Sequence, residues 1–148
     1  MTLDVKNFPP AVIFNCEKPV ICALNDAAAG FGMDMALACD IRIMAEGAKM
    51  APTPVKRGIV PESGGTWILP RLVGWEKATE IFFTARNLGA AESKELGLCA
   101  HVVPDAELMV FAASGRQALF NNCSTGHLTS SCCLSFAAHH PANRSQKI

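Results

Sequence analysis

The sequence predicts an α/β fold, and three local patterns support that prediction. Residues Pro19 to Leu24 form an apolar run with β-branched side chains, ended by an Asn-Asp pair, which is typical of a buried strand. Gly30 begins a segment whose apolar residues recur at helical spacing. Ile41 and Ile43 then alternate with Arg42, as in a second strand. Half of the 148 residues are hydrophobic, which is ordinary for one compact domain.

The elements of the first half follow in order along the chain. A strand is predicted over Pro19–Leu24, and a helix follows from Gly30 to Cys39, with glycines that allow close backbone approach at its start. A second strand is predicted over Asp40–Met44. Its alternation places Arg42 on the opposite face from the isoleucines, where we expect the guanidinium to be solvated.

The second half begins with a loop. Prolines and glycines are frequent in residues 51–65, so this stretch is predicted to contain at most one turn of helix. The remaining elements have helical or alternating patterns. They are a short helix that opens at Ser63 or Gly64 and runs to Leu69, a helix over Trp75–Thr84, a helix over Ala90–Leu96 stopped by Gly97, and a strand over Leu98–Val103.

The character of the sequence changes beyond Phe111. Serine, cysteine, histidine and asparagine crowd residues 121–145, and no helical or strand period persists there. Residues 112–148 are therefore predicted to be a disordered or divergent tail. A sequence-specific binding segment is the alternative interpretation.

Charge and hydropathy exclude two classes of protein. Thirteen basic and thirteen acidic residues cancel, which argues against an electrostatic nucleic-acid binder. No apolar run reaches the roughly 18 residues that a membrane span needs. The N-terminus also lacks the pattern of a secretory signal. The sequence therefore predicts a cytoplasmic protein that does not contact a membrane.

The cysteines and histidines do not indicate a metal site. The seven cysteines are odd in number, and several lie inside apolar segments, which favours buried reduced thiols over a disulfide scaffold. No C-x-x-C pair is present, and the four histidines lack the spacing of zinc ligands. We therefore expect no metal.

The glycines at the start of the first helix are a candidate binding motif. Gly30-Phe31-Gly32 follows a strand, but Met35 replaces the third glycine of a dinucleotide fingerprint, and no acidic residue ends a strand about 20 residues on. A helix start of this kind can instead present the backbone N–H of Phe31 to a developing negative charge, as half of an oxyanion hole. A tight turn with a buried Phe31 ring is the structural alternative.

Three segments, in this order, carry a family resemblance: KPVICALNDAAAGFGMDMALACDIRIMAEGAKM, RGIVPESGGTWILPRLVG and LGLCAHVVPDAEL. They resemble the crotonase family, also called the enoyl-CoA hydratase/isomerase superfamily. The resemblance implies a ββα spiral with helices on the outside, truncated here, with residues 18–111 as the core after a divergent segment 1–17. It also implies homo-trimers or hexamers that bind acyl-CoA thioesters of fatty acid metabolism, with coenzyme A as part of the substrate and no separate cofactor.

The resemblance also assigns residues to a site. Two backbone N–H groups would hold the thioester oxygen as an enolate, and one of them matches Phe31. The substrate would contact Ala28, Gly30, Asp34, Pro54 and Pro61. Asp34 and Pro54 match the two glutamates of the hydratases, and a proline cannot accept a proton. Glu62 matches the carboxylate of some isomerases and dehalogenases, and a raised pKa would suit it to proton transfer.

Two functional hypotheses follow. The first is an acyl-CoA enzyme, nearer to the enoyl-CoA isomerases than to the two-glutamate hydratases, which act as lyases. Glu62 would be its acid/base, and Phe31 would supply an oxyanion donor. The second is a catalytically inactive crotonase-like oligomerisation module. The module is considered because the family's N-terminal half, with the second oxyanion donor, has no counterpart among residues 1–17.

Overall fold

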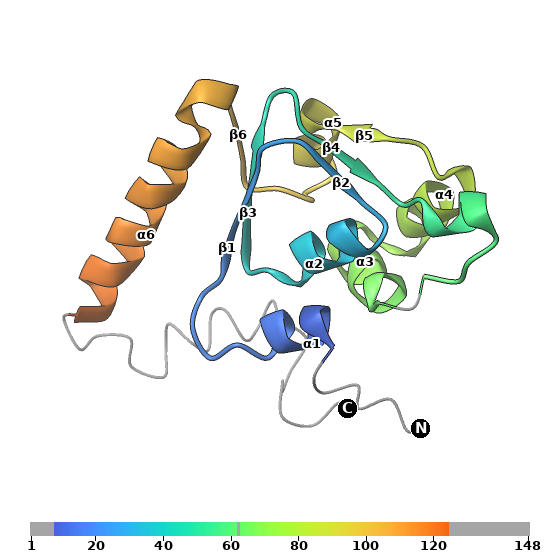
Figure 1. Ribbon diagram of the computed structural model, residues 1–148, viewed down its shortest axis with the longest axis horizontal. Coiled ribbons are helices and arrows are strands. Elements are labelled where there is room, and N and C mark those ends of the chain that lie inside the picture. The colour runs from blue at the N-terminus through green and yellow to red at the C-terminus, as the bar shows by residue number, and fades with distance from the viewer. Residues whose placement is uncertain (1–7, 62, 125–148) are drawn as a thin grey trace.

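The computed structural model describes residues 8–61 and 63–124, which form two small sheets with helices around them (Figure 1). The first sheet is parallel, with strand order β1 (Ile21–Leu24), β3 (Ile41–Ala45) and β6 (His101–Val103). The second has the order β2 (Ala27–Ala29), β4 (Lys49–Ala51) and β5 (Leu88–Gly89). Strand β4 is parallel to β2 and antiparallel to β5.

The first four strands enter the two sheets alternately, and then β5 joins the second sheet and β6 the first. The chain passes through β1, β2 and helix α2 (Phe31–Ala38), and then repeats the path through β3 and β4. In the first sheet Ile21 lies opposite Ile41, and in the second Ala27 lies opposite Lys49. Each turn of the chain therefore adds one strand to each sheet. This repeat is a ββα spiral, and it confirms the predicted α/β class.

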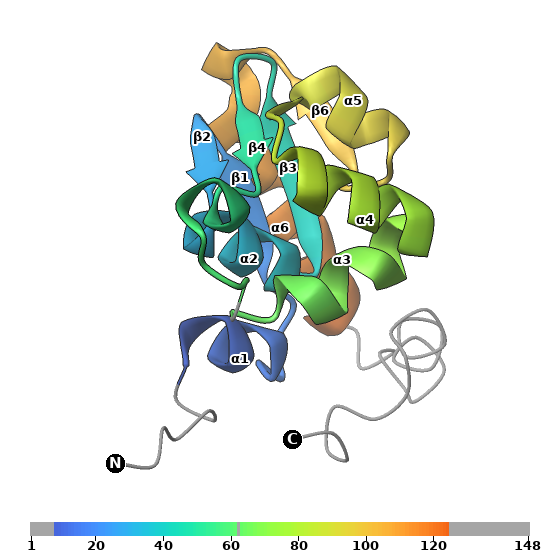
Figure 2. The same ribbon diagram turned by 90° about the vertical axis from the view of Figure 1, so that its right-hand side faces the viewer.

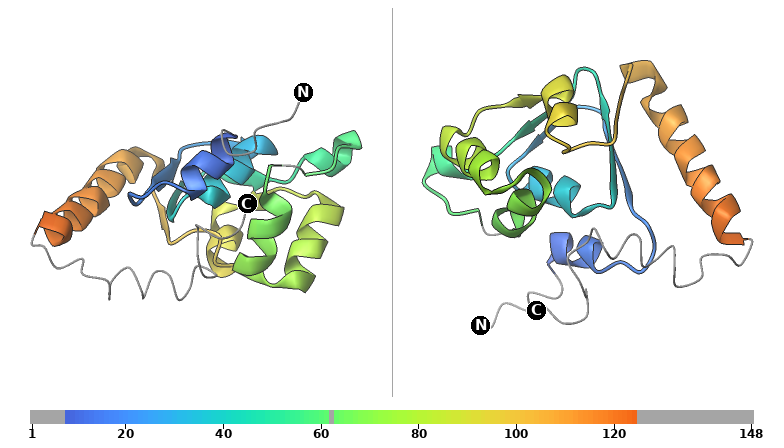
Figure 3. Two further views of the ribbon diagram at one scale, coloured as in Figure 1. Left: turned by 90° about the horizontal axis from the view of Figure 1, so that it is seen from below. Right: turned by 180° about the vertical axis from the view of Figure 1, so that it is seen from behind.

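Helices lie on the outside of the spiral. They are α1 (Pro9–Phe14), α2, the 3-10 turn η2 (Pro54–Arg57), α3 (Gly65–Val73), α4 (Trp75–Thr84), α5 (Ala90–Glu95), the 3-10 turn η3 (Asp105–Glu107) and α6 (Leu108–Ser124). Figure 2 shows α3, α4 and α5 gathered on one side of the sheets. Helix α6 lies apart from them and contacts β1 and β3 (Figure 3).

Helix α6 corrects the prediction for the C-terminal tail. We expected no folded element after Phe111. For residues 112–124 this expectation is wrong, because α6 continues to Ser124. Its sequence lacks a strong apolar stripe, so the local sequence does not predict a helix. Contacts of α6 with β1 and β3 stabilise it instead. Residues 125–148 lie outside the described part of the chain, so the prediction for them stays a prediction.

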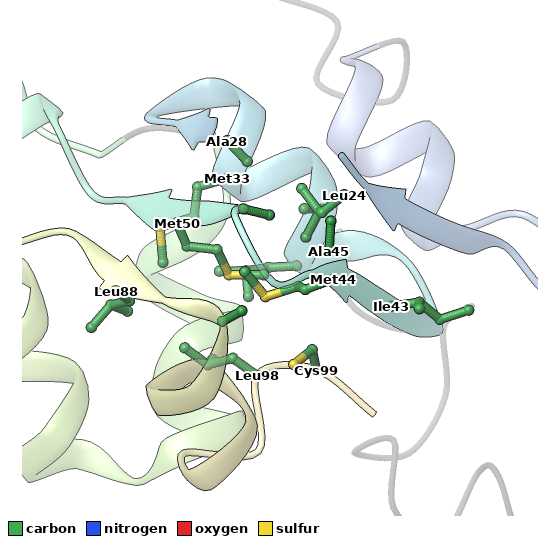
Figure 4. Packing of buried hydrophobic residues seen from close by; sticks show 14 of the residues in the cluster. Leu24, Ala28, Met33, Ile43, Met44, Ala45, Met50, Leu88, Leu98 and Cys99 are labelled. Carbon is green, nitrogen blue, oxygen red and sulfur yellow. The ribbon is translucent and has the colours of Figure 1, made fainter. Parts of the chain in front are cut away.

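Methionines join the two sheets at the centre of the core. Met33 of α2, Met44 of β3 and Met50 of β4 are almost completely buried, and Figure 4 shows them close to Leu88 and Leu98. Unbranched methionine side chains adapt to irregular gaps between elements that meet at different angles. This core fixes α2 against β3 and β4, and so determines where the first turn of α2 lies.

The expectation of a solvated Arg42 is wrong. Arg42 is only 8% exposed, because β3 is the central strand of its sheet and is covered on both faces. The guanidinium Nε donates to the carbonyl oxygen of Leu98 at 2.6 Å, and Nη1 donates to those of Leu37 and Cys39. One buried side chain therefore ties the end of α2 to the segment before β6.

We expect Arg42→Leu to lower the free energy of unfolding by about 3 kcal/mol or more, because three carbonyl oxygens lose a charged donor. Urea unfolding of the chain measures this. The control is Arg86→Leu, which removes a half-exposed guanidinium paired with Glu80 and Glu92 and is expected to change stability much less. Equal effects of the two substitutions would contradict this role of Arg42.

Residues 8–61 and 63–124 contain neither a helix suited to span a membrane nor a cluster of metal-ligating side chains. None of their helices combines the length and apolar character that a bilayer span requires. No group of three or more histidine, cysteine, aspartate or glutamate side chains comes together there in a way that could hold a metal ion.

Candidate functional site

The candidate site begins where β2 passes into α2. The N–H of Gly30 donates to the carbonyl oxygen of Ala51 at 2.8 Å and so extends the pairing of β2 with β4 by one residue. Gly30 has φ 52° and ψ −115°, which turns the chain sharply into the helix. A Cβ atom on Gly30 would lie 2.9 Å from Oγ1 of Thr53. Glycine is therefore required here both by backbone conformation and by the close approach of Thr53.

The first turn of α2 presents backbone donors without a partner inside the helix. The N–H of Asp34 is the first that bonds within α2, to the carbonyl oxygen of Gly30 at 3.1 Å. The N–H groups of Phe31, Gly32 and Met33 precede it. Phe31 is 43% exposed. The positive end of the helix dipole and a donor at an accessible residue make this turn suitable for binding an anionic oxygen.

The Phe31 ring has a neighbour of its own. It packs edge to face against Phe8, with ring centroids 5.4 Å apart. Phe8 is the N-cap residue of α1. The alternative of a fully buried Phe31 ring is therefore wrong, because the ring lies between α2 and the segment before α1, where it remains partly accessible.

Asp34 connects the starts of two helices. Its side chain is 5% exposed and accepts a hydrogen bond from the backbone N–H of Gly65, the first residue of α3. Burial raises the pKa of this carboxyl to about 6, and the bond from Gly65 opposes that rise only in part. Asp34 is thus a buried carboxyl, three residues after Phe31, that titrates near neutral pH.

The raised pKa of Asp34 predicts how stability depends on pH. Between pH 3.8 and about 6 the folded chain holds a proton on Asp34 that the unfolded chain releases, so stability falls as pH rises through this range. After allowance for solvent screening, we expect a loss of about 2 kcal/mol relative to Asp34→Asn, which keeps an acceptor for Gly65. Urea unfolding at several pH values measures the difference. Parallel pH profiles for the two proteins would contradict the assignment.

Gly65 leaves the space that the Asp34 carboxyl occupies. A Cβ atom on Gly65 would lie 2.9 Å from Cγ of Asp34 and closer still to one carboxyl oxygen. We expect Gly65→Ala to destabilise the chain by about 1–3 kcal/mol through this overlap. The control is Gly32→Ala, because a Cβ on Gly32 meets no atom within 4 Å. A thermal unfolding temperature unchanged in Gly65→Ala, or lowered equally in both variants, would contradict the packing described.

The structure brings together four of the predicted site residues. Gly30, Phe31 and Asp34 lie in one turn, and a Cβ on Gly30 would be 3.8 Å from Cδ of Pro54, the first residue of η2. Ala28 is buried in β2, two residues before Gly30. No described contact joins Pro61 to this group, and Glu62 lies outside the described residues.

Two residues that shape the site were missed by the sequence analysis. Thr53 lies against Gly30, and Gly65 donates to Asp34. The pair of glycines before the apolar run of α3 was an available signal, since adjacent glycines at a helix start often allow another group to approach the backbone closely. Nothing in the local sequence marks Thr53.

Comparisons with known proteins agree with this fold. A sequence model described as enoyl-CoA hydratase/isomerase matches residues 10–134, which extends beyond both expected limits of the core. Carnitinyl-CoA dehydratase of Escherichia coli K12 is 42% identical over 110 residues, 74% of this chain and 42% of that protein. Mouse mitochondrial methylglutaconyl-CoA hydratase is 45% identical over 91 residues, 62% of this chain and 29% of that protein.

Solved structures give the same result. An enoyl-CoA hydratase from Bacillus anthracis superposes with a TM-score of 0.75 at 39% identity, over 76% of this chain and 44% of that one. The enoyl-CoA hydratase EchA12_1 from Mycobacterium marinum also superposes with a TM-score of 0.75, at 36% identity. The superposition covers 88% of this chain and 64% of that one. These are crotonase-fold proteins. The chain belongs to the enoyl-CoA hydratase/isomerase family. It spans less than half the length of the carnitinyl-CoA dehydratase and of the methylglutaconyl-CoA hydratase that it matches.

Proposed function

We propose that this chain contributes the enolate-stabilising part of a site for acyl-CoA thioesters. The observation that carries the proposal is the first turn of α2, where the N–H of Phe31 precedes the first hydrogen bond inside the helix and lies at an accessible residue. A donor already held in place needs no reorganisation when negative charge develops on the thioester oxygen. The family to which the chain belongs supports an acyl-CoA as the occupant.

The same site favours the isomerase type over the two-glutamate hydratase type. Pro54 occupies the position of one hydratase glutamate by resemblance, and it stands against the Gly30 turn without any group that can exchange a proton. Asp34 remains, but its carboxyl is buried against α3 and hydrogen-bonded to Gly65. A hydratase mechanism, in which two opposed carboxylates activate water, would therefore lack the carboxylate that Pro54 replaces.

In the proposed reaction Glu62 removes a proton from carbon α or γ of the thioester. The electron pair moves toward the thioester carbonyl, where Phe31 N–H stabilises the enolate oxygen. Return of the proton to the other carbon moves the double bond and restores the carboxylate. The described residues do not identify the second oxyanion donor. A homo-trimer or hexamer and a cytoplasmic location stay predictions, and the mouse relative is named as mitochondrial.

A comparison of two substrates tests this proposal. The chain is mixed with a 3-enoyl-CoA and, separately, with a 2-enoyl-CoA, and the products are separated by chromatography and mass. Conversion of the 3-enoyl to the 2-enoyl thioester, faster than addition of water to the 2-enoyl thioester, is expected. Faster hydration would overturn the isomerase assignment. Absence of both turnover and binding would overturn the enzyme proposal and favour the inactive module.

A further inference from the structure

Thr53 lies beside the turn that leads into α2. A Cβ atom on Gly30 would be 2.9 Å from Oγ1 of Thr53, so the hydroxyl lies next to the backbone of Gly30. The carbonyl oxygen of Ala51 accepts hydrogen bonds from the N–H of Gly30 at 2.8 Å and from the N–H of Thr53 at 2.9 Å. One acceptor therefore ties both residues together, and these backbone bonds fix the place of Thr53 relative to the turn.

The hydroxyl of Thr53 has no hydrogen-bond partner among residues 8–61 and 63–124. Thr53 is the N-cap residue of η2, a position at which a threonine oxygen often accepts a bond from the first turn, but its side chain makes no such bond. Thr53 is half-buried. Since a hydroxyl carries one donor and two acceptor sites, its O–H is available to a bound molecule.

The same side of Gly30 carries the N–H of Phe31. Gly30 has ψ −115°, and at this angle the nitrogen of the next residue nearly eclipses the Cβ position about the Cα–C bond. The nitrogen of Phe31 and Oγ1 of Thr53 therefore lie on one side of the turn. The N–H of Phe31 precedes the first hydrogen bond inside α2, and the residue is 43% exposed. A backbone donor and a side-chain donor thus lie beside each other at the start of α2.

The other groups described at this turn cannot take that role. The atoms next closest to the Cβ position of Gly30 are Cδ and Cγ of Pro54, at 3.8 and 4.0 Å, and neither can donate. The carboxyl of Asp34 accepts the N–H of Gly65, at the start of α3. Among the described side chains next to the turn, Thr53 is therefore the one that offers a neutral donor.

We propose that the Thr53 hydroxyl donates a hydrogen bond to the same thioester oxygen that the Phe31 N–H binds. This inference rests on the proposed acyl-CoA function. It adds a side-chain donor to the two backbone donors that the family resemblance implies. Negative charge grows on the oxygen as the enolate forms, so a donor beside it stabilises the transition state more than the ground state. The hydroxyl keeps its proton throughout, and the acid/base step stays with the carboxylate.

The test compares Thr53→Val with Thr53→Ser in the full chain. Valine keeps the shape of threonine but has no O–H, whereas serine keeps the O–H and lacks only the methyl group. Isomerisation of a 3-enoyl-CoA is measured at saturating substrate, and infrared difference spectroscopy measures the carbonyl stretch of a bound, isotope-labelled enoyl-CoA. Thr53→Val should lower kcat by about 10²-fold and reduce the shift of the stretch, and Thr53→Ser should keep both close to wild type. Thermal unfolding checks that each variant folds, and Thr53→Ala is a second variant without the O–H.

The infrared readout separates a hydrogen bond from a structural role. If Thr53 only packs against Gly30, the shift in Thr53→Val should equal that of wild type, or fall equally in Thr53→Val and Thr53→Ser. Either result would overturn this inference. A shift that Phe31→Pro reduces and Thr53→Val does not would leave the proposed function intact and overturn the role of Thr53 alone. A wild-type chain that does not bind the thioester, or binds it without a shift, would overturn both.

Discussion

Phe31→Pro should lower the turnover of an enoyl-CoA thioester by about 10²–10³-fold relative to Phe31→Ala, the usual effect of losing one oxyanion donor. Proline lacks the backbone N–H that we propose as the donor. The first position of a helix tolerates proline, because that N–H has no partner inside the helix and the φ angle is already suitable. Gly30, which precedes it, has φ 52° and ψ −115°, outside the right-handed helical region that a following proline disfavours.

Phe31→Ala is the matched control for this prediction. Both substitutions remove the ring that packs on Phe8, but only proline removes the N–H. The two variants should therefore have similar thermal unfolding temperatures, and turnover is measured on both at saturating substrate. Equal turnover in two folded variants would show that the Phe31 N–H does not stabilise the transition state.

Glu62→Gln should have a second large effect, a loss of about 10²–10⁴-fold in isomerisation with little change in acyl-CoA binding. The amide keeps the size of the side chain but cannot carry the proton between carbons. Asp34→Asn is the comparison, since Asp34 is the carboxyl that lies closest along the chain to the proposed donor. Its buried position against Gly65 suits it to a structural role, so we expect less than about a tenfold loss.

Turnover and calorimetric binding of an enoyl-CoA are measured for wild type and both variants. A large loss in Asp34→Asn with little change in Glu62→Gln would reverse the assignment and make Asp34 the acid/base. The pKa of about 6 that burial gives Asp34 would then match the pH dependence of turnover.

Elements with a complete local pattern could be predicted from the sequence. Helix α4 has the predicted bounds Trp75–Thr84, because its apolar face is regular and Gly74 precedes it. Strands β2, β4 and β5 were missed, since each has only two or three residues and exists through pairing with distant segments. Arg42 was misplaced for a related reason. Alternation along a strand does not reveal that a second layer covers its other face.

The candidate site could be predicted in part. The glycine motif and the resemblance located Gly30 and Phe31 correctly at a strand-to-helix turn. The environment of Asp34 could not be foreseen, because it depends on the N–H of Gly65, which lies 31 positions further along the chain. The hydrogen bonds that hold Arg42 likewise come from carbonyl groups on two separate elements. Such contacts follow from the assembled spiral.

The most direct test of the proposed function is the carbonyl stretch of a bound, isotope-labelled enoyl-CoA thioester, measured by infrared difference spectroscopy. Hydrogen bonding from the first turn of α2 should polarise this carbonyl and shift its stretch to lower frequency in wild type and in Phe31→Ala. The shift should be clearly smaller in Phe31→Pro at equal occupancy. A thioester that binds to the wild-type chain without a shift, or that shifts equally in Phe31→Pro, would contradict the proposal that this turn holds the thioester oxygen.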